Sequence, residues 1–366
     1  MISRLAQPSS APPELPDLAD ESVRARLLAR VRGGWRAVAG IGNVWRAEGG
    51  FSNETWFADV DVDGARQTVV LRRQALIGPL EPYDLGREAA ILDALRASAL
   101  PVPDVYLFCD DAEVIGAPFM LMERIDGVVP EYRSLPEYAP WADPANRSAM
   151  AREVMRILAV VQGVPVAAEP LAQVFAGDAG EPDAPPVVRR VRWILDKLKL
   201  QLGDDAVPPV LRHAASWLVR NAPPVTGGCV LVHGDYKMGN FIWQGNSIAA
   251  VLDWEATSVG DPLEDLGYAC HPLMRTRAPE LMAMLVPFNE LVRLYEEETG
   301  RTVDLRTLHY YVVYALYFHL YTLVSGVVAA HNGADLRVGL GYAKFHRATR
   351  ELIANITAFE EGAHVL

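Results

Sequence analysis

The chain has 366 residues, half of them apolar and 22% charged, and its formal net charge is -12. This length suggests two domains or lobes, and the acidic balance argues against a nucleic-acid binder, which needs a basic face to meet phosphates. The three cysteines, Cys109, Cys229 and Cys270, form no CxxC pair. They indicate neither a disulfide framework nor a zinc site, so we expect a reducing, cytoplasmic location.

The first third of the chain is predicted to be rich in β-structure. Residues 1–20 are rich in proline, serine and alanine and lack the apolar stretch of a secretory signal, so we expect a flexible tail. Alternating apolar residues on both sides of an Asp-Gly turn predict a β-hairpin over residues 54–73. Further elements are predicted as a helix over 86–98 and strands over 101–109 and 118–127. Residues 21–125 should therefore be mostly β with one amphipathic helix.

From residue 126 onward the pattern is mainly helical. Two helices are predicted, over 145–164 and over 187–202, with a loop rich in proline, glycine and alanine over 165–186 between them. The apolar stretch 310–326 contains several tyrosines, a histidine, a threonine and a serine, which makes it marginal for a membrane span. We interpret it as a buried helix in which His319 is a satisfied core histidine, and we expect no membrane partner.

The segment "LVHGDYKMGNFIW" places an Asp and an Asn between two apolar strands. The residues after it predict a second hairpin, with strands over 241–243 and 248–252, and this register brings Asn240 close to Asp253. An amide oxygen beside a carboxylate is a pair of hard ligands of the kind that magnesium accepts. Asp235 lies at the entry to the same loop. Each residue alone could be a turn residue, but the combination with Asp253 favours a site.

"HGDYKMGN" and "LDWE" resemble the catalytic and metal-binding motifs of the aminoglycoside phosphotransferase-like family of kinases, which share a fold with protein kinases. The resemblance covers about residues 40–350. It implies an α+β, bilobal, protein-kinase-like fold: a small β-rich nucleotide-binding lobe over 21–125, and a larger helical lobe over 126–366 with the catalytic loop and the acceptor site. It also implies Asp235 as the catalytic residue, and Asn240 and Asp253 as magnesium ligands.

Upstream segments are similar to the family's nucleotide-binding parts. "EGGFSNETW" resembles the phosphate-covering loop, which implies contacts to ATP from Gly49, Gly50, Phe51, Ser52 and Asn53. Arg72 departs from the family pattern because it stands where an ATP-binding lysine is usual, and we interpret it as tolerated because arginine keeps the charge and can fork onto phosphate. Glu88 matches the helix glutamate that pairs with this cation. The backbone from Glu123 to Ile125 matches the hinge that meets adenine.

Other residues near the motif are expected to support the loop. Asp265 is predicted to brace the catalytic loop through hydrogen bonds to its backbone, and His233 to orient the loop rather than to move protons. Asp261 could lie at the start of a helix. Lys237 could either offset phosphate charge or be a solvated loop residue.

The resemblance implies an ATP- and Mg²⁺-dependent phosphotransferase that acts on a hydroxyl of a small molecule. The acceptor stays open between an aminoglycoside, a macrolide, a homoserine-like compound or sugar alcohol, and a hydroxyacyl-CoA compound. The last is the substrate class implied by similarity to the branch of kinases fused to, or working with, acyl-CoA dehydrogenases. A protein acceptor is disfavoured because the chain goes almost directly from Asp253 to the helix predicted over 261–266. A catalytically silent nucleotide-binding module is the alternative, and the oligomeric state is not indicated.

Overall fold

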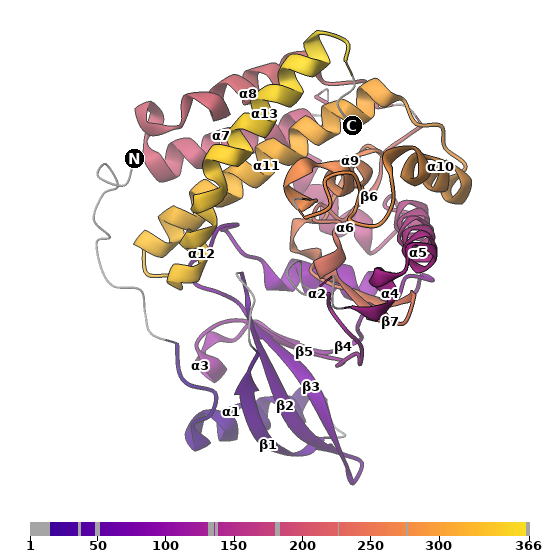
Figure 1. Ribbon diagram of the computed structural model, residues 1–366. Helices are drawn as coiled ribbons and strands as arrows, with labels where there is room; N and C mark the ends of the chain where they lie inside the picture. The colour runs from indigo at the N-terminus through magenta and orange to yellow at the C-terminus, as the bar shows by residue number, and fades with distance from the viewer. Residues whose placement is uncertain are drawn as a thin grey trace.

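The computed structural model describes residues 15–35, 38–47, 52–130, 135, 138–179, 184–225, 227–275 and 277–363. Within these residues the chain forms a smaller lobe built around a β-sheet and a larger, mainly helical lobe. The β-rich lobe is at the bottom of Figure 1 and the helical lobe is above it. The predicted α+β class with a small β-rich lobe and a larger helical lobe is therefore confirmed.

An antiparallel sheet of five strands, in the order β1-β2-β3-β5-β4, forms the smaller lobe. The strands are β1 (Val38–Arg46), β2 (Glu54–Val62), β3 (Ala65–Arg73), β4 (Val105–Cys109) and β5 (Phe119–Met122). The predicted hairpin is present as β2 and β3. Side chains alternate along β3, so Val69, Leu71 and Arg73 are buried on one face of the sheet. Arg72 therefore projects from the opposite face.

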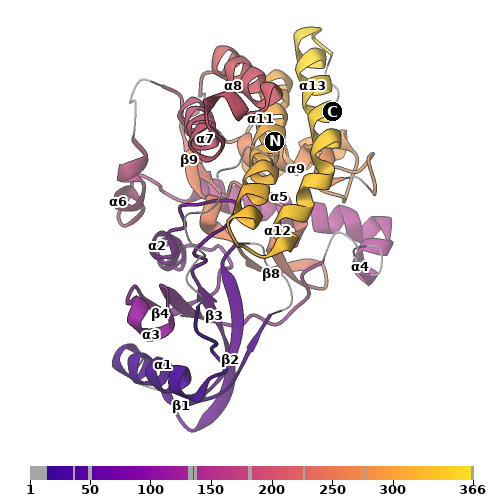
Figure 2. The same cartoon turned by 90° about the vertical axis from the view of Figure 1, so that its left-hand side faces the viewer.

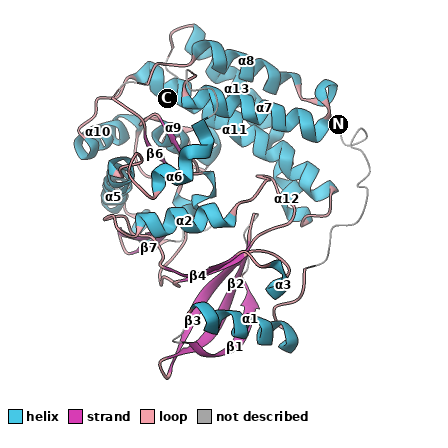
Figure 3. Cartoon of the chain, turned by 180° about the vertical axis from the view of Figure 1, so that it is seen from behind, coloured by secondary structure: helices cyan, strands magenta, loops and turns pink. Residues whose placement is uncertain are grey.

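The smaller lobe contains more helix than the single one predicted. Besides α2 (Leu85–Leu95), it has α1 (Glu21–Gly34) and the short α3 (Ala112–Ile115). Helix α1 lies along the sheet in Figure 3. Its core-facing residues, spaced four apart, are Val23, Leu27 and Val31. The prediction of one helix was wrong here because three apolar positions among arginines and alanines give a weak helical pattern.

Part of the predicted tail, residues 15–20, lies within the described chain. Leu18 is fully buried in the core of the smaller lobe, and the carbonyl of Pro16 accepts a hydrogen bond from Arg73 at 2.7 Å. Residues 1–14 lie outside the described residues, so the flexibility expected for them stays a prediction.

The larger lobe is a helical bundle with two small β-elements. Its helices are α4 (Ala139–Ala142), α5 (Pro144–Gly163), α6 (Leu171–Phe175), α7 (Pro186–Leu202), α8 (Pro209–Asn221), α9 (Glu264–Cys270), α10 (Phe288–Thr299), α11 (Leu305–His331), α12 (Leu336–Leu340) and α13 (Phe345–Glu360). Helices α7, α8, α11 and α13 pack side by side, as Figures 1 and 2 show. Helices α5 and α7 confirm the two helices predicted. The loop predicted between them instead contains α6.

Helix α11 contains the apolar stretch discussed above. Among the described helices it is long and apolar enough to cross a membrane by length and composition, with a mean hydropathy of 1.7 in its most apolar window. However, 78% of that window is buried inside the protein, and α8, α9 and α13 pack against the helix. The prediction of a buried helix is confirmed.

Four short strands lie on both sides of the segment that contains Asp235 and Asn240. They are β6 (Val230–Val232), β7 (Phe241–Gln244), β8 (Ser247–Val251) and β9 (Ser258–Gly260). Strands β7 and β8 form the predicted hairpin, with Trp243 opposite Ile248. The segment that leaves the sheet is hydrogen-bonded to this hairpin, because Val128 exchanges two backbone hydrogen bonds of 2.8 and 2.9 Å with Trp243.

Candidate active site

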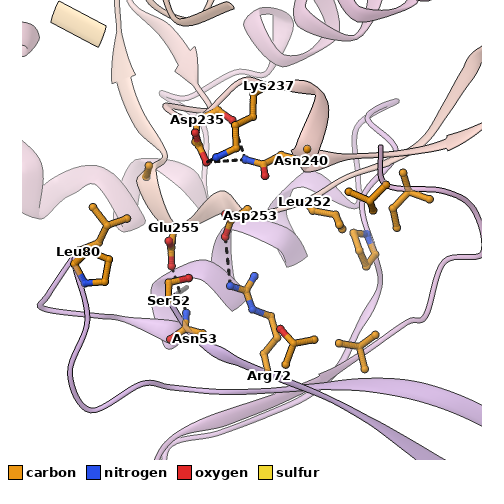
Figure 4. Close-up of a pocket in the computed structure, with 18 of the residues that line it drawn as sticks. Ser52, Asn53, Arg72, Leu80, Asp235, Lys237, Asn240, Leu252, Asp253 and Glu255 are labelled. Atoms are coloured by element: carbon orange, nitrogen blue, oxygen red, sulfur yellow. Dashed lines mark hydrogen bonds and ion pairs between the residues drawn. The ribbon is translucent and has the colours of Figure 1, made fainter. Parts of the chain in front are cut away.

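A cavity of about 870 Å³ is lined by residues of both lobes. Among the residues that line it are these predicted site residues: Ser52, Asn53, Arg72, Glu123, Ile125, Asp235, Asn240 and Asp253. Several of them face one another in Figure 4. Gly49, Gly50 and Phe51 lie outside the described residues. The fold thus brings together positions that are about 180 residues apart in the sequence.

The loop that carries Asp235 is held from behind by Asp265 of α9. The two carboxylate oxygens of Asp265 accept hydrogen bonds from the backbone N–H groups of His233 (2.8 Å) and Gly234 (2.9 Å). The ring of His233 accepts a bond from the backbone N–H of Asp235 at Nδ1, which leaves Nε2–H to donate to the carbonyl of Leu252. The predicted bracing by Asp265 and the orienting role of His233 are therefore both present.

The two carboxylate oxygens of Asp235 have different surroundings. Oδ2 accepts hydrogen bonds from Lys237 (2.5 Å) and from the amide nitrogen of Asn240 (2.8 Å). Oδ1 is buried, and no donor in the described part of the chain reaches it with hydrogen-bond geometry. Burial alone would raise the pKa of Asp235, but the charge of Lys237 and the hydrogen bonds, with a contribution from the Tyr268 hydroxyl, hold it below its ordinary value. Asp235 is therefore a carboxylate at neutral pH.

Lys237 lines the same cavity, with about a third of its side chain exposed. Burial would lower its pKa, but the charge of Asp235 raises the pKa above the ordinary value, so the ammonium stays charged. Lys237 is paired with the carboxylate of Asp235. It is therefore not a solvated loop residue, and this excludes one of the two alternatives that the sequence left open.

Arg72 connects a carboxylate of the smaller lobe with one of the larger lobe. Its guanidinium contacts Glu88 of α2 at 2.5 Å and Asp253 at 3.4 Å. Glu88 is almost completely buried, and Arg72 is 12% exposed. Burial would lower the pKa of Arg72, but Glu88, Asp253 and Glu255 together raise it, so the guanidinium stays charged in a buried position. The pairing of Glu88 with the cation at position 72 is as predicted.

Asn240 and Asp253 approach each other through the β7–β8 hairpin. The backbone N–H of Leu252 donates to the carbonyl of Asn240 at 2.8 Å, as the predicted register required. The amide nitrogen of Asn240 is occupied by Asp235, which leaves its amide oxygen for another partner. Asp253 adopts a left-handed backbone conformation (φ 68°), and its side chain remains 29% exposed. Both side chains line the cavity.

The donor set fits a magnesium ion that is bound together with phosphates. Within the described residues, no group of three or more His, Cys, Asp or Glu side chains is arranged to hold a metal ion. The protein therefore offers few oxygen ligands, here the amide of Asn240 and the carboxylate of Asp253. Magnesium usually keeps several waters and is shared with substrate phosphates, so these two side chains are compatible with it.

Glu255 is a further residue of this site. The sequence showed only that it lies two positions after Asp253, and did not predict that it lines the cavity. It lines the cavity two residues after Asp253, and the amide of Asn53 donates to its Oε2 at 3.5 Å (Figure 4). Burial and the nearby charge of Asp253 raise its pKa well above the ordinary value, against the opposing charge of Arg72. Glu255 thus links the end of the predicted phosphate-covering loop to the segment that carries Asp253.

The wall beyond Asp235 comes from the helical lobe. Its residues are Tyr268, Met274, Phe318, His319, Thr322, Leu323, Arg337, Gly341 and Lys344. No carboxylate is among these described lining residues. The prediction that His319 is a satisfied core histidine was wrong: it lines the cavity, and its buried Nε2 has no hydrogen-bond partner among the described residues.

Curated proteins with similar sequences include acyl-CoA dehydrogenase family members. The chain is 28% identical over 336 residues to acyl-CoA dehydrogenase family member 11 of Gallus gallus, covering 85% of this chain and 40% of that protein. It is 30% identical over 223 residues to the Homo sapiens protein of the same name, covering 60% of this chain and 26% of that protein. The chain thus spans two fifths or less of the length of these relatives.

Solved structures with the same fold include aminoglycoside phosphotransferases. A crystal structure described as a candidate aminoglycoside phosphotransferase from Ralstonia eutropha superimposes with a TM-score of 0.69 at 25% identity, covering 92% of this chain and 98% of that one. A thermostable mutant of aminoglycoside phosphotransferase APH(4)-Ia, in ternary complex with ADP and hygromycin B, has a TM-score of 0.56 at 16% identity and covers 91% and 98%. These likenesses confirm the kinase-like form of the predicted fold.

The family itself is identified from the sequence. The model for the phosphotransferase enzyme family matches residues 44–299, a span that includes strands β2 to β5 of the sheet, the loop of Asp235 and the β7–β8 hairpin that precedes Asp253. The predicted resemblance is confirmed. With more than half of its length matched, the chain belongs to the phosphotransferase enzyme family.

Proposed function

We propose that this protein transfers the γ-phosphate of ATP to a hydroxyl of a small molecule, with Asp235 as the catalytic residue and Mg²⁺ as cofactor. The observation that carries the proposal is the asymmetry of the Asp235 carboxylate. Oδ2 is fixed by Lys237 and Asn240, while Oδ1 is buried and receives no well-aligned donor from the described chain, although the Tyr268 hydroxyl also interacts with this carboxylate. An acceptor hydroxyl in the cavity would supply that donor.

The nucleotide would lie between the sheet and the β7–β8 hairpin. Arg72 would direct its guanidinium at the phosphates, and Ser52 and Asn53 line the cavity beside it. Contacts from Gly49, Gly50 and Phe51 remain part of the proposal. The backbone from Glu123 to Ile125 would meet adenine. Apolar lining residues on both sides of the proposed adenine position are Phe57, Val70, Met122, Ile242 and Leu252.

Asn240 and Asp253 would hold the magnesium ion. When bound, Mg²⁺ neutralises charge on the phosphate oxygens and fixes their orientation. Binding of the ion by Asp253 would weaken the contact between this carboxylate and Arg72, which at 3.4 Å is already the longer of the two ion pairs of Arg72. The guanidinium would then keep Glu88 as its close partner.

In the transfer step, the acceptor oxygen forms a bond to the γ-phosphorus while the bond from that phosphorus to the β,γ-bridging oxygen breaks, and ADP leaves. The proton of the hydroxyl passes to Asp235, which is ionised at neutral pH because Lys237 and hydrogen bonds lower its pKa. Lys237 lies beside this carboxylate and offsets charge near the transferred group. Asp265 keeps the loop in position throughout.

Hydroxyacyl-CoA compounds are the acceptor class that we favour over aminoglycosides. Aminoglycosides are polycations and require carboxylates in the acceptor wall. The described wall beyond Asp235 contributes none and carries Lys344 beside the apolar Phe318 and Leu323, whereas Arg337 is paired with Asp335 at 2.7 Å. The other carboxylates of the cavity, Glu123, Asp126, Asp253 and Glu255, lie outside this wall. Relatives named acyl-CoA dehydrogenase family members support the same choice. A silent nucleotide-binding module is the remaining alternative.

The proposal is tested by measuring ADP release from Mg-ATP with hygromycin B, erythromycin or 3-hydroxybutyryl-CoA as acceptor. We expect acceptor-dependent turnover, most with the acyl-CoA compound, and a loss of about 100- to 10,000-fold in kcat in Asp235→Ala with unchanged nucleotide binding. The matched control is Asp205→Ala, an exposed aspartate outside the cavity. Full activity of Asp235→Ala would refute the role of Asp235. Nucleotide binding without turnover of any acceptor would favour the silent module.

A further inference from the structure

Helix α11 turns one narrow side toward the cavity. Four of its residues line the cavity with helical spacing: Phe318, His319, Thr322 and Leu323. Their neighbours Tyr317 and Leu320 are fully buried on the other sides of the helix. This side of α11 therefore forms part of the wall of the cavity that contains Asp235.

The two polar side chains on this side differ in their hydrogen bonds. The hydroxyl of Thr322 donates to the carbonyl of His319 in its own helix at 2.8 Å. The Nε2 atom of His319 is buried and has no partner among the described residues. Buried polar atoms in native proteins are nearly always hydrogen-bonded, so an unpartnered nitrogen at the wall of a cavity points to a ligand atom that completes it.

The electrostatic surroundings keep His319 neutral. Burial, together with the positive charges of Lys344 and Lys237, lowers its pKa to about 4, against the opposing effect of Asp235. A neutral imidazole offers one N–H donor and one acceptor nitrogen. The ring of His271 lies 5.6 Å away, centroid to centroid, and its pKa is lowered as well, by burial and by nearby positive groups that include Lys237 and Arg275. His271 is therefore neutral as well and adds no charge beside His319.

We propose that His319 binds the acceptor, donating an imidazole N–H to one of its oxygen atoms and so placing the reacting hydroxyl against Oδ1 of Asp235. The inference rests on the proposed function and adds the second point by which the acceptor is held. Asp235 and His319 line one cavity, and each has a buried atom that no described residue reaches with good hydrogen-bond geometry. A hydroxyl or carbonyl oxygen suits His319, whereas a protonated amine would meet the charges of Lys237 and Lys344.

The test compares wild type, His319→Leu and His319→Gln with 3-hydroxybutyryl-CoA, erythromycin and hygromycin B. Binding is read from thermal shifts and turnover from ADP release in Mg-ATP. Leucine removes the donor, and glutamine restores an N–H at a similar distance from the backbone. For each probe that wild type uses, we expect about a tenfold rise in acceptor KM in His319→Leu. His319→Gln should recover most of it, and the KM for ATP should stay constant in both variants.

The outcomes separate this inference from the proposed function. If wild type phosphorylates a probe and His319→Leu does so with the same KM, or if the ATP KM changes as much as the acceptor KM, the role of His319 is refuted while the function stands. Binding of a probe that depends on His319 but leads to no transfer would refute the function and, with it, the placing of a reacting hydroxyl, and would support only the contact between His319 and the ligand. If wild type neither binds nor phosphorylates any probe, both are overturned.

Discussion

The buried pair of Arg72 and Glu88 makes a quantitative prediction about stability. We consider the variants Arg72→Met and Glu88→Leu, singly and combined. Arg72 is 12% and Glu88 2% exposed, with the charged atoms 2.5 Å apart. Each single variant leaves one buried charge without its close partner, which typically costs about 3–5 kcal/mol. The double variant replaces the pair by apolar side chains and should lose at least about 3 kcal/mol less than the sum of the singles.

Urea unfolding followed by tryptophan fluorescence measures this cycle, since the chain contains 8 tryptophans. The matched control is the exposed pair of Arg96 and Asp104, whose charged atoms are 2.9 Å apart with side chains 61% and 39% exposed. Solvent screens that pair, so its cycle should be close to additive.

A further variant, Arg72→Lys, tests why an arginine stands at this position. It keeps a charge for Glu88 but cannot fork toward Asp253, so nucleotide binding should weaken with little loss of stability.

Two results would refute this reasoning. One is a loss of less than about 1 kcal/mol in Arg72→Met, which would mean that Glu88 is not an uncompensated buried charge in that variant. The other is a cycle that is additive within about 0.5 kcal/mol, as for residues without contact. Either would also weaken the assignment of Arg72 as the cation that directs the phosphates.

Three further predictions concern single positions. Asp253→Ala should weaken binding of Mg-ATP in calorimetry, while binding of ATP without magnesium changes little. Gly234→Ala should lower the thermal unfolding temperature and abolish transfer, because φ is +84° there and a Cβ atom would lie 2.4 Å from the carbonyl oxygen of Ala256. For His319, the native pKa of about 4 lies below the ordinary 6.5. The unfolded chain therefore binds the proton more readily, and stability falls as pH drops from 6.5 through 4. Compared with His319→Leu, wild type should lose up to about 3 kcal/mol over this interval in pH-dependent urea unfolding.

The local part of the site could be predicted because short-range register determines it. The tight turn between β7 and β8 sets which residues face each other, and this places Asn240 near Asp253. The hairpin of β2 and β3 was predictable for the same reason. Alternation along β3 then separates Arg72 from its buried neighbours. None of these inferences needs contacts between distant segments.

The remaining features depend on packing that a linear pattern does not encode. Helix α11 is apolar nearly all round, so its sequence gives no preferred side, and the orientation of His319 toward the cavity could not be inferred. Asn53 and Glu255 are 202 positions apart, and their contact depends on how the two lobes meet. The helix predicted over 86–98 is present as α2, but the apolar pattern of α1 was too sparse to be recognised.

The bridge between Val128 and Trp243 determines which parts of the protein can move together. Gly127 lies directly before it, and a Cβ atom at that position would be 2.4 Å from the side chain of Ile242 and 2.7 Å from the carbonyl oxygen of Trp243. Val128 is therefore hydrogen-bonded to the β7–β8 hairpin through both of its backbone polar groups. A rotation of the sheet against the helices has to be absorbed by the few residues between Met122 and Gly127. The proposed adenine contacts would lie on the pivot itself, so nucleotide occupancy and the angle between the lobes would be coupled.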